Sequence, residues 1–322
     1  MSDNILKIRD LSVNYQTDRG KLKALRHVDL DIPRGSIVGV VGESGCGKST
    51  LITSIIRQLD ANADIPNGSI EFEKQDLLKL SVDKMRNISG TKLSIVFQDP
   101  MSTLNPVLSI GRQMIDIQYR DKSSKKIKKQ RSIDMLTKVG IPDPQSQLNQ
   151  YPHELSGGMQ QRVSIAMALQ AEPSLLIADE PTTALDATLE VQILKLLKEL
   201  QEEMGCSILF VSHHLGVIAE ICDHVIVMYA GEIVEQGSTT EIFNKPAHPY
   251  TIKLLECDPA SISKKQRLLP SIPGEIPDLI NLSGGCIFKN RCDQSIDRCD
   301  KHAPKWNEFA DNHYVSCHLI ES

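Results

Sequence analysis

The 322-residue sequence contains few aromatic residues and only a mild excess of acidic over basic ones. Phe, Trp and Tyr together make up 4% of the chain, which disfavours the aromatic platforms on which the bases of single-stranded nucleic acids stack. The net charge of −5 gives no sign of a surface that attracts phosphate backbones. We therefore expect no nucleic-acid partner.

Segments that would take the chain into or across a membrane are also missing from the sequence. The most apolar stretch, residues 207–228, is interrupted by His213, His214, Glu220 and Asp223 and falls short of the ~20 apolar residues of a membrane span. Residues 1–13 contain no apolar core of a secretory signal. We expect a soluble protein of the reducing cytosol, where stable disulfides among its eight cysteines are disfavoured.

Strand-like and helix-like segments alternate through most of the chain. The apolar run at residues 36–42 is typical of a strand buried on both faces, and a glycine-rich turn and a helix-like segment, 49–59, follow it. Apolar residues recur at helical spacing over residues 188–204, and Gly205 suits the end of that helix. This alternation predicts an α/β fold with a parallel sheet. Further strands are expected at residues 4–15, 25–32, 68–73, 93–98, 175–180, 207–213 and 224–231.

The composition changes after about residue 238. Proline-rich text at residues 268–279 predicts an extended connector, and a cysteine-rich segment follows it. We therefore predict one domain over residues 1–237 and a C-terminal extension over residues 238–322. Within the first domain, residues from about 100 to 160 lack strong strand patterns and are expected to form a helical subdomain. A lysine-rich run in that region, DKSSKKIKKQR, is interpreted as a solvated helix face or loop.

The motif with the clearest chemistry is GESGCGKST, which fits the phosphate-loop pattern G-x-x-x-x-G-K-S/T. It follows a buried strand and opens a helix. Glycines let successive backbone N–H groups converge on phosphate oxygens, and the helix N-terminus adds positive potential. Lys48 is placed to reach the β- and γ-phosphates, and the Ser49 hydroxyl to bind Mg²⁺. The residues of the motif expected to bind nucleotide are Gly42, Glu43, Ser44, Gly45, Cys46, Gly47, Lys48, Ser49 and Thr50.

Two carboxylates end the later strand-like segment LLIADE. Asp179 is predicted to join the Mg²⁺ shell, because a strand end beside a phosphate loop brings its carboxylate there. Glu180 follows directly and can orient or deprotonate the attacking water. The pair therefore predicts hydrolysis of a nucleoside triphosphate.

The segment LSGGMQQR, residues 155–162, lies between these two motifs. With it the chain resembles the nucleotide-binding subunits of ABC transporters, whose signature is usually LSGGQ; Met159 holds the last place here. The resemblance implies that Ser156, Gly157 and Gly158 grip the γ-phosphate of ATP held by an opposite subunit, so a dimer is expected. It also implies a P-loop NTPase (RecA-like) core with an antiparallel β subdomain, a helical subdomain and a small cysteine-containing extension.

Other residues match family motifs in the same order along the chain. Gln98 is similar to the Q-loop residue that touches Mg²⁺ and senses the membrane subunits, and Asp186 to the D-loop residue. His213 is similar to the switch histidine, although the family usually has Asp where this chain has His214. Tyr15 is placed like the aromatic that stacks on adenine, or is plain packing. The residues expected to act in catalysis are Lys48, Glu180 and His213. The expected Mg²⁺ ligands are Ser49, Gln98 and Asp179.

Longer motifs narrow the resemblance. FQDPMSTLNPV, SGGMQQR, ADEPTTALD, HPYT and the cysteine-rich tail are similar to the oligopeptide, dipeptide and nickel importers, and to the first of their two unlike ATPase components. This implies an ATPase that powers import of di- or oligopeptides, or alternatively of nickel or another metal chelate. It also implies a second, different ATPase subunit, two membrane permease subunits, indirectly an extracellular or periplasmic solute-binding protein, and a peripheral place on the cytoplasmic face of the membrane.

Three other classes share part of this motif set. Chromosome-maintenance ATPases separate the halves of the site by a very long coiled coil, whereas here 56 residues lie between Gln98 and Leu155. Ribosome-associated cassette proteins normally carry two cassettes, and this chain has one. A metal-binding tail on a vestigial nucleotide site is disfavoured by the intact set of catalytic residues.

Four of the eight cysteines lie in the tail with the spacing C-x5-C-x6-C-x17-C, at Cys286, Cys292, Cys299 and Cys317. Four thiolates suit either a 4Fe-4S cluster or a structural Zn²⁺, and unligated buried thiols are the third interpretation. The spacings are longer than typical zinc knuckles, but the three histidines of the tail could complete a zinc site. Tails of this kind in the peptide-importer branch are associated with a 4Fe-4S cluster. The expected cofactors are thus ATP, Mg²⁺ and a 4Fe-4S cluster, with Zn²⁺ as the alternative.

Overall fold

A computed structural model of the chain describes residues 3–99, 103–183, 185–258, 270–282 and 284–320. The chain divides into two compact units, one formed by Met1–Lys79 with Phe210–Ser322 and the other by Leu80–Leu209. The predicted domain boundary after residue 237 stays a prediction. Residues 100–102 of the predicted helical subdomain and of the FQDPMSTLNPV motif, residue 184 of the ADEPTTALD motif, and residues 268–269 of the predicted connector lie outside the described residues.

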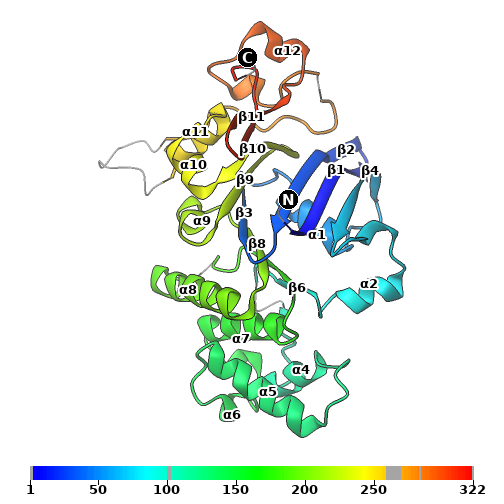
Figure 1. Cartoon of the computed structure of the whole chain (residues 1–322), viewed down its shortest axis with the longest axis vertical. Helices are drawn as coiled ribbons and strands as arrows, with labels where there is room; N and C mark the ends of the chain where they lie inside the picture. The colour runs from blue at the N-terminus through cyan, green and yellow to red at the C-terminus, as the bar shows by residue number, and fades with distance from the viewer. Residues whose placement is uncertain (1–2, 100–102, 184, 259–269, 283, 321–322) are drawn as a thin grey trace. The chain divides into compact units, whose positions relative to one another are not determined.

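An antiparallel sheet forms one layer of the first unit (Figure 1). Strand β1 (Asn4–Thr17) pairs with β2 (Gly20–Pro33) on one side and with β4 (Ala63–Phe72) on the other, and the short β5 (Gln75–Asp76) follows β4. Along β1, Leu6 and Ile8 are buried while Arg9 is exposed, because alternate side chains of a strand face opposite sides. The expected antiparallel subdomain is confirmed.

A second sheet of the first unit carries the phosphate loop. All five residues of β3 (Ile37–Val41) are buried, and β3 pairs in parallel with β9 (His224–Tyr229). Strand β10 (Glu232–Ser238) pairs antiparallel with β9, β12 (His313–Ser316) with β10, and β11 (Trp306–Ala310) with β12. The cysteine-bearing tail thus adds strands to the same sheet. The sequence did not predict these strands, because they are short. The helices of this unit are α1 (Lys48–Ile55), α9 (Leu215–Ile221), α10 (Thr239–Asn244), α11 (Pro249–Glu256) and α12 (Asp297–Lys301), with 3-10 turns η1 (Leu77–Lys79) and η4 (Lys289–Arg291).

The second unit is mainly helical. Its strands β6 (Leu93–Val96) and β7 (Leu175–Asp179) pair in parallel, and β8 (Ser207–Val211) spans the boundary between the units. Helix α8 (Ala187–Met204) ends at Gly205, as the sequence predicted, and Gly205 has a left-handed φ of 63°, which glycine adopts readily. The remaining helical elements are α2 (Val82–Ile88), α4 (Ile110–Asp116), α5 (Lys125–Lys138), α6 (Pro144–Gln147), η2 (Pro152–Glu154) and α7 (Gly157–Leu169). No helix in the described part of the chain is long and apolar enough to cross a membrane.

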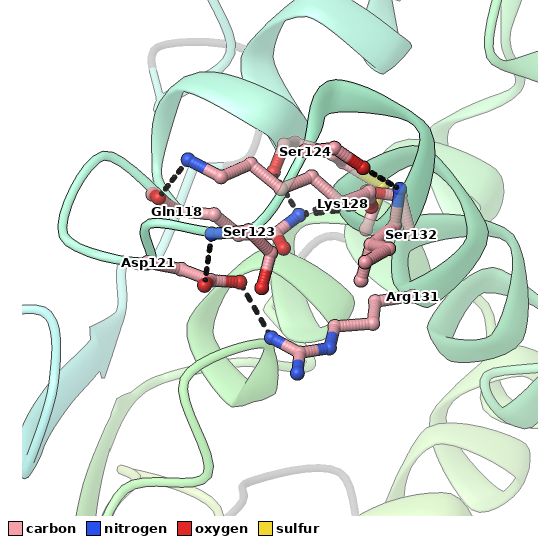
Figure 2. Close-up of polar contacts among 9 residues, drawn as sticks. Gln118, Asp121, Ser123, Ser124, Lys128, Arg131 and Ser132 are labelled. Carbon is pink, nitrogen blue, oxygen red and sulfur yellow. Dashed lines mark hydrogen bonds and ion pairs between the residues drawn. The ribbon is translucent and has the colours of Figure 1, made fainter.

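The lysine-rich run forms the start of α5 and the turn before it (Figure 2). Ser124 caps the helix, Lys128 donates from Nζ to the Gln118 carbonyl oxygen over 2.7 Å, and Arg131 pairs with Asp121. These contacts bind the run to the end of α4 within its own unit. The exposed lysines around them agree with a solvated helix face.

Candidate functional site

The phosphate loop closes around Lys48. The side chain of this residue is buried in the turn between β3 and α1, and its Nζ donates to the carbonyl oxygens of Gly42 at 2.7 Å and Glu43 at 3.1 Å. Nζ also lies 3.6 Å from the sulfur of Cys46. Two backbone carbonyl oxygens therefore hold the ammonium of Lys48 at the loop.

Two glycines of the loop have no room for a side chain. A Cβ atom on Gly42, where φ is 153°, would lie 2.2 Å from the Met228 carbonyl oxygen. One on Gly47, where φ is 110°, would lie 2.8 Å from Cδ2 of Leu25. The loop can thus approach β9 and β2 only with glycine at both places.

The thiol of Cys46 faces inward below the loop. The residue is 1% exposed, and burial raises the pKa of its thiol. Its carbonyl oxygen accepts a hydrogen bond of 2.9 Å from the N–H of Gly231, just after β9. Cys46 therefore packs the loop onto the sheet, and a neutral thiol is poorly reactive.

The remaining predicted residues of the first unit are at least partly accessible. Ser44, Gly45 and Ser49 are exposed and Thr50 is half-buried. Tyr15 is half-buried in β1 opposite Leu22, and its predicted stacking on adenine stays a prediction. His213 is exposed after β8, while the backbone N–H of His214 donates to the Ser212 hydroxyl over 3.0 Å. The assignment of His213 as the switch residue likewise stays a prediction.

Glu180 lies at a sharp turn after β7 in the second unit. Its φ of 46° is in the left-handed region, which costs a non-glycine residue about 1 kcal/mol or more. One oxygen of its carboxylate accepts hydrogen bonds from the Gln98 amide at 3.0 Å and from the Thr183 hydroxyl at 3.0 Å. The half-buried Asp179 precedes it. The structure thus brings the predicted Q-loop residue to the predicted hydrolytic carboxylate, held in a fixed orientation.

The signature segment begins α7 in the same unit. Ser156 is the N-cap, and its hydroxyl accepts from the backbone N–H three residues later at 3.4 Å. Ser156 and Gly157 are exposed, whereas Gly158 is buried. Gln161 is buried and donates over 2.6 Å to the carbonyl oxygen of Pro181, the residue after Glu180. The signature helix is therefore tied to the turn that holds Glu180.

Asp186 caps the next helix. Its carboxylate accepts from the N–H groups of Thr188 and Leu189, both at 3.0 Å, and so fixes the start of α8. Negative charge at a helix N-terminus is stabilised by the helix dipole. The predicted D-loop residue thus has a clear structural role, and its role at the nucleotide stays a prediction.

Two residues of the C-terminal extension contact the phosphate loop, and sequence reasoning did not predict this. Arg291 forms a bidentate ion pair with Glu43, with distances of 2.7 Å from Nη1 to Oε2 and 3.0 Å from Nη2 to Oε1. The Tyr250 hydroxyl accepts from the N–H of Glu43 at 2.9 Å. The residues lie 248 and 207 positions from Glu43, so no local pattern links them.

The four tail thiols lie within electrostatic reach of one another. Burial above all, with smaller contributions from Cys299, Cys317 and Cys292, raises the pKa of Cys286 to about 11. Burial likewise raises the pKa of Cys292 and Cys317, with added contributions from other thiols of the group. Among the described residues, however, no group of three or more Cys, His, Asp and Glu side chains is arranged to hold a single metal ion. The thiols are gathered without forming a closed ligand shell.

In two tail histidines, Nε2 lies within hydrogen-bond distance of an oxygen atom of the protein. His313 shares a 2.7 Å contact with Glu235, and both side chains are fully buried. Nε2 of His318 lies 2.8 Å from the His302 carbonyl oxygen. These contacts disfavour His313 and His318 as zinc ligands through that nitrogen. Outside the tail, the Cys206 and Cys222 side chains are buried in the core.

Comparison with known families adds two matches. Residues 25–183 match the family model described as ABC transporter. Residues 234–299 match the model described as the C-terminal region of oligopeptide and dipeptide transporters. The first match spans the phosphate loop, the signature and Glu180, and the second includes Tyr250, Arg291 and three of the four tail cysteines.

Curated relatives are similar over nearly the whole chain. The dipeptide transport ATP-binding protein DppD of Escherichia coli is 42% identical over 315 residues, covering 98% of this chain and 96% of the relative. DppD of Bacillus subtilis is 44% identical over 319 residues, covering 98% and 95%. The oligopeptide transport ATP-binding protein OppD of Bacillus subtilis is 43% identical over 318 residues, covering 98% and 89%.

Solved structures give the same fold. An ATP-binding cassette captured as a dimer in a post-hydrolysis state with ADP and phosphate superposes with a TM-score of 0.65 at 29% identity, covering 73% of this chain and 98% of that one. The cbiO1 subunit of a Clostridium perfringens ABC transporter complex also gives a TM-score of 0.65, at 32% identity and with coverage of 76% and 92%. This chain therefore belongs to the ATP-hydrolysing subunits of the oligopeptide and dipeptide ABC transporters.

Proposed function

We propose that this chain binds Mg·ATP on its phosphate loop and hydrolyses it to power import of di- or oligopeptides. The observation that carries the proposal is the end-to-end similarity to peptide-transport ATP-binding proteins, together with a phosphate loop closed on Lys48. The match of the tail to the oligopeptide and dipeptide model favours peptides over nickel or another metal chelate. ATP-dependent uptake of a labelled dipeptide, compared with that of ⁶³Ni²⁺, by vesicles carrying the whole transporter tests the substrate class.

In this proposal each predicted residue has one role in hydrolysis. Lys48 and the loop N–H groups hold the β- and γ-phosphates and offset the charge that develops on them. Hydroxyl, amide and carboxylate oxygens are suitable Mg²⁺ ligands, and Ser49, Gln98 and Asp179 supply one of each. Glu180 orients the attacking water or takes its proton, and His213 contacts the γ-phosphate. The hydrogen bonds of Glu180 to Gln98 and Thr183 support its assignment, because a catalytic carboxylate must be held in place.

The complete ATP site is proposed to need two cassettes. Ser156 and Gly157 begin α7 exposed, and in a dimer they would meet the nucleotide on the partner's phosphate loop. The solved cassette with ADP and phosphate is itself a dimer, which supports this arrangement. We propose that the partner is a second, different ATPase subunit, since the resemblance is to the first of two unlike components.

We therefore expect the isolated subunit to hydrolyse ATP slowly, about 100-fold below its rate in the assembled transporter. The reason is that Lys48 and Ser156 of one chain serve different nucleotides. Steady-state phosphate release is measured for the chain alone, with the partner cassette, and with the membrane subunits added. Ser156→Ala serves as the matched variant, because it should lower the assembled rate while leaving ATP binding by the lone chain unchanged. Full activity in a strictly monomeric preparation contradicts the composite site.

The same proposal places the chain peripherally on the cytoplasmic face of the membrane. Its other partners are two membrane permease subunits, contacted through the surface around Gln98, and indirectly an extracellular or periplasmic solute-binding protein. We propose residues 1–237 as the nucleotide-binding domain, with a helical subdomain at about 100–160, and residues 238–322 as the extension. Co-purification of the permeases with the tagged chain tests these contacts, and release of the chain by Gln98→Ala would locate them.

We also propose that Cys286, Cys292, Cys299 and Cys317 ligate a 4Fe-4S cluster. The mutual electrostatic reach of the four thiols supports this proposal, as does the burial of Cys299 and Cys317. Each cysteine of a cluster ligates a different iron atom, so the four sulfurs need not converge on one ion. A single Zn²⁺ would require that convergence, which the described residues do not offer. When bound, the cluster would supply folding energy to the small tail.

Protein purified without oxygen is accordingly expected to be brown and to carry about four irons per chain. Iron, zinc and acid-labile sulfide are measured on the intact chain. Cys292→Ser should remove the colour and most of the iron, whereas Cys206→Ser, at a buried thiol outside the tail, should keep both. A colourless anaerobic protein with one zinc per chain would establish the zinc alternative, and a metal-free one the interpretation of the thiols as unligated.

A further inference from the structure

The ion pair between Arg291 and Glu43 joins the tail to the phosphate loop within one compact unit. The Arg291 side chain is only 4% exposed, compared with 28% for that of Glu43. A bidentate arginine–carboxylate pair fixes both the position and the direction of the carboxylate. Glu43 therefore has a defined orientation set by a residue of the extension.

Arg291 is itself held by several backbone and ring contacts. Its Nε donates to the Pro273 carbonyl oxygen and its Nη2 to that of Ile272, both at 3.0 Å. Its guanidinium lies 5.7 Å from the centroid of the Tyr229 ring, in the range of a cation–π contact. These contacts fix the Arg291 side chain in place, and Arg291 in turn positions the Glu43 carboxylate.

Aromatic packing holds the same part of the extension against the loop. Tyr229 of β9 contacts the rings of Tyr250 and Phe288, with centroids 4.6 Å and 5.1 Å away. The Tyr250 hydroxyl accepts from the N–H of Glu43, so the backbone of this residue is fixed as well as its side chain. Phe288 and Arg291 belong to the same short segment around η4.

An acidic side chain in a phosphate-binding loop requires an explanation. The carbonyl oxygen of Glu43 accepts a hydrogen bond from Lys48 Nζ, so the residue lies next to the cation that binds phosphate. An unpaired carboxylate there would repel the triphosphate and compete for the ammonium of Lys48. Pairing with Arg291 cancels that charge and turns it away.

We propose that Arg291 is a positioning residue of the ATP site, which keeps the Glu43 carboxylate neutralised and away from the phosphates. The extension then has two roles: it carries the four tail cysteines, and it completes the nucleotide site. This inference rests on the proposed binding of ATP at the phosphate loop.

The test is a double-mutant cycle on the full-length chain, with binding of Mg·AMP-PNP measured by titration calorimetry. Arg291→Met should weaken binding about tenfold, because the freed carboxylate repels the triphosphate at short range. Glu43→Gln alone should bind at least as tightly as the wild type, because it removes only the negative charge of the side chain and keeps the loop backbone. The double variant Glu43→Gln/Arg291→Met should recover most of the lost affinity. Lys301→Met, at an exposed cation of the same extension, is the matched control and should bind normally.

A purely structural role for Arg291 predicts a different pattern. The double variant would then bind as weakly as Arg291→Met, and this result overturns the inference, as does normal binding by Arg291→Met. In the assembled transporter the inference also expects a raised KM for ATP with kcat changed less than about twofold. If Arg291→Met does not fold, the affinity of Glu43→Gln for AMP-PNP tests the inference by itself. Weaker binding by Glu43→Gln would mean that the carboxylate helps ATP to bind, and this result would overturn the inference.

The proposed site and the inference can fail separately. Lys48→Ala should abolish AMP-PNP binding if the nucleotide occupies the phosphate loop. Unchanged binding by Lys48→Ala would remove the proposed site itself. If Lys48→Ala loses binding but Arg291→Met binds normally, the proposed ATP site stands and only the role of Arg291 is refuted.

Discussion

Replacement of Glu180 by Gln is expected to lower ATP turnover at this chain's own site by at least about 100-fold. The amide keeps the shape of the side chain, and Gln98 and Thr183 still have an oxygen to approach. What is lost is the negative charge that orients water and takes its proton. ATP binding should remain within about threefold of the wild-type value, because the phosphate contacts of Lys48 are unchanged. The variant should therefore accumulate as the closed, ATP-bound dimer.

The measurement is ATP hydrolysis by the complete transporter, with the dimer followed by gel filtration. A second, different ATPase subunit would contribute its own turnover, so residual activity must be compared with that of transporters whose partner site is inactivated. Glu172→Gln is a matched control, because Glu172 also has a left-handed φ, 50°, but is exposed and precedes β7, whereas Glu180 follows that strand. Wild-type hydrolysis by Glu180→Gln would show that another group acts on the water.

Replacement of Gly42 by Ala is expected to abolish nucleotide binding and to destabilise the chain. The added Cβ would lie 2.2 Å from the Met228 carbonyl oxygen and 2.7 Å from the Cys46 sulfur. The first neighbour is backbone of β9 and cannot rotate away. The loop must therefore move off the strand and lose the geometry that surrounds Lys48. We expect a loss of at least about 3 kcal/mol in the free energy of unfolding, combining overpacking with backbone strain.

Substitutions at two other glycines measure the cost of backbone strain without a steric clash. Gly35 has a φ of 67° and nothing within 4 Å of an added Cβ, so Gly35→Ala should cost only about 1 kcal/mol and leave binding intact. Gly45, at φ 80° and equally open, tests the same strain inside the loop. Urea unfolding and AMP-PNP titration give both quantities. Binding by Gly42→Ala within threefold of the wild type would contradict the tight contact with β9.

Local patterns were sufficient wherever the structure depends on neighbours in sequence. The buried strand β3, the loop after it and the helix α8 ending at Gly205 all lie where the sequence predicted them. Each depends on the apolar period of its own residues and on glycine at left-handed positions. The order of the family motifs also assigned roles to Gln98, Glu180 and Ser156, and these roles stay predictions.

The strand pairing and the long-range contacts of the extension could not be predicted from the sequence. Its strands β11 and β12 are short, and β12 pairs with the edge of β10, a strand about 80 residues earlier in the chain. The Glu235–His313 pair, fully buried, joins that edge to the tail from residues 78 positions apart. Strand pairing and buried polar contacts of this kind depend on the partner that the fold supplies.

The sequence by itself determined the family, the α/β core and the residues proposed to handle ATP, because phosphate binding requires particular residue types at fixed spacing. Only the tertiary structure decided how Glu43, an acidic residue inside the phosphate loop, is accommodated. The answer is a buried arginine 248 positions away, with Tyr250 on the same residue's backbone. An arginine that is only 4% exposed needs an opposite charge, and the two partners can come from any parts of the chain that pack together.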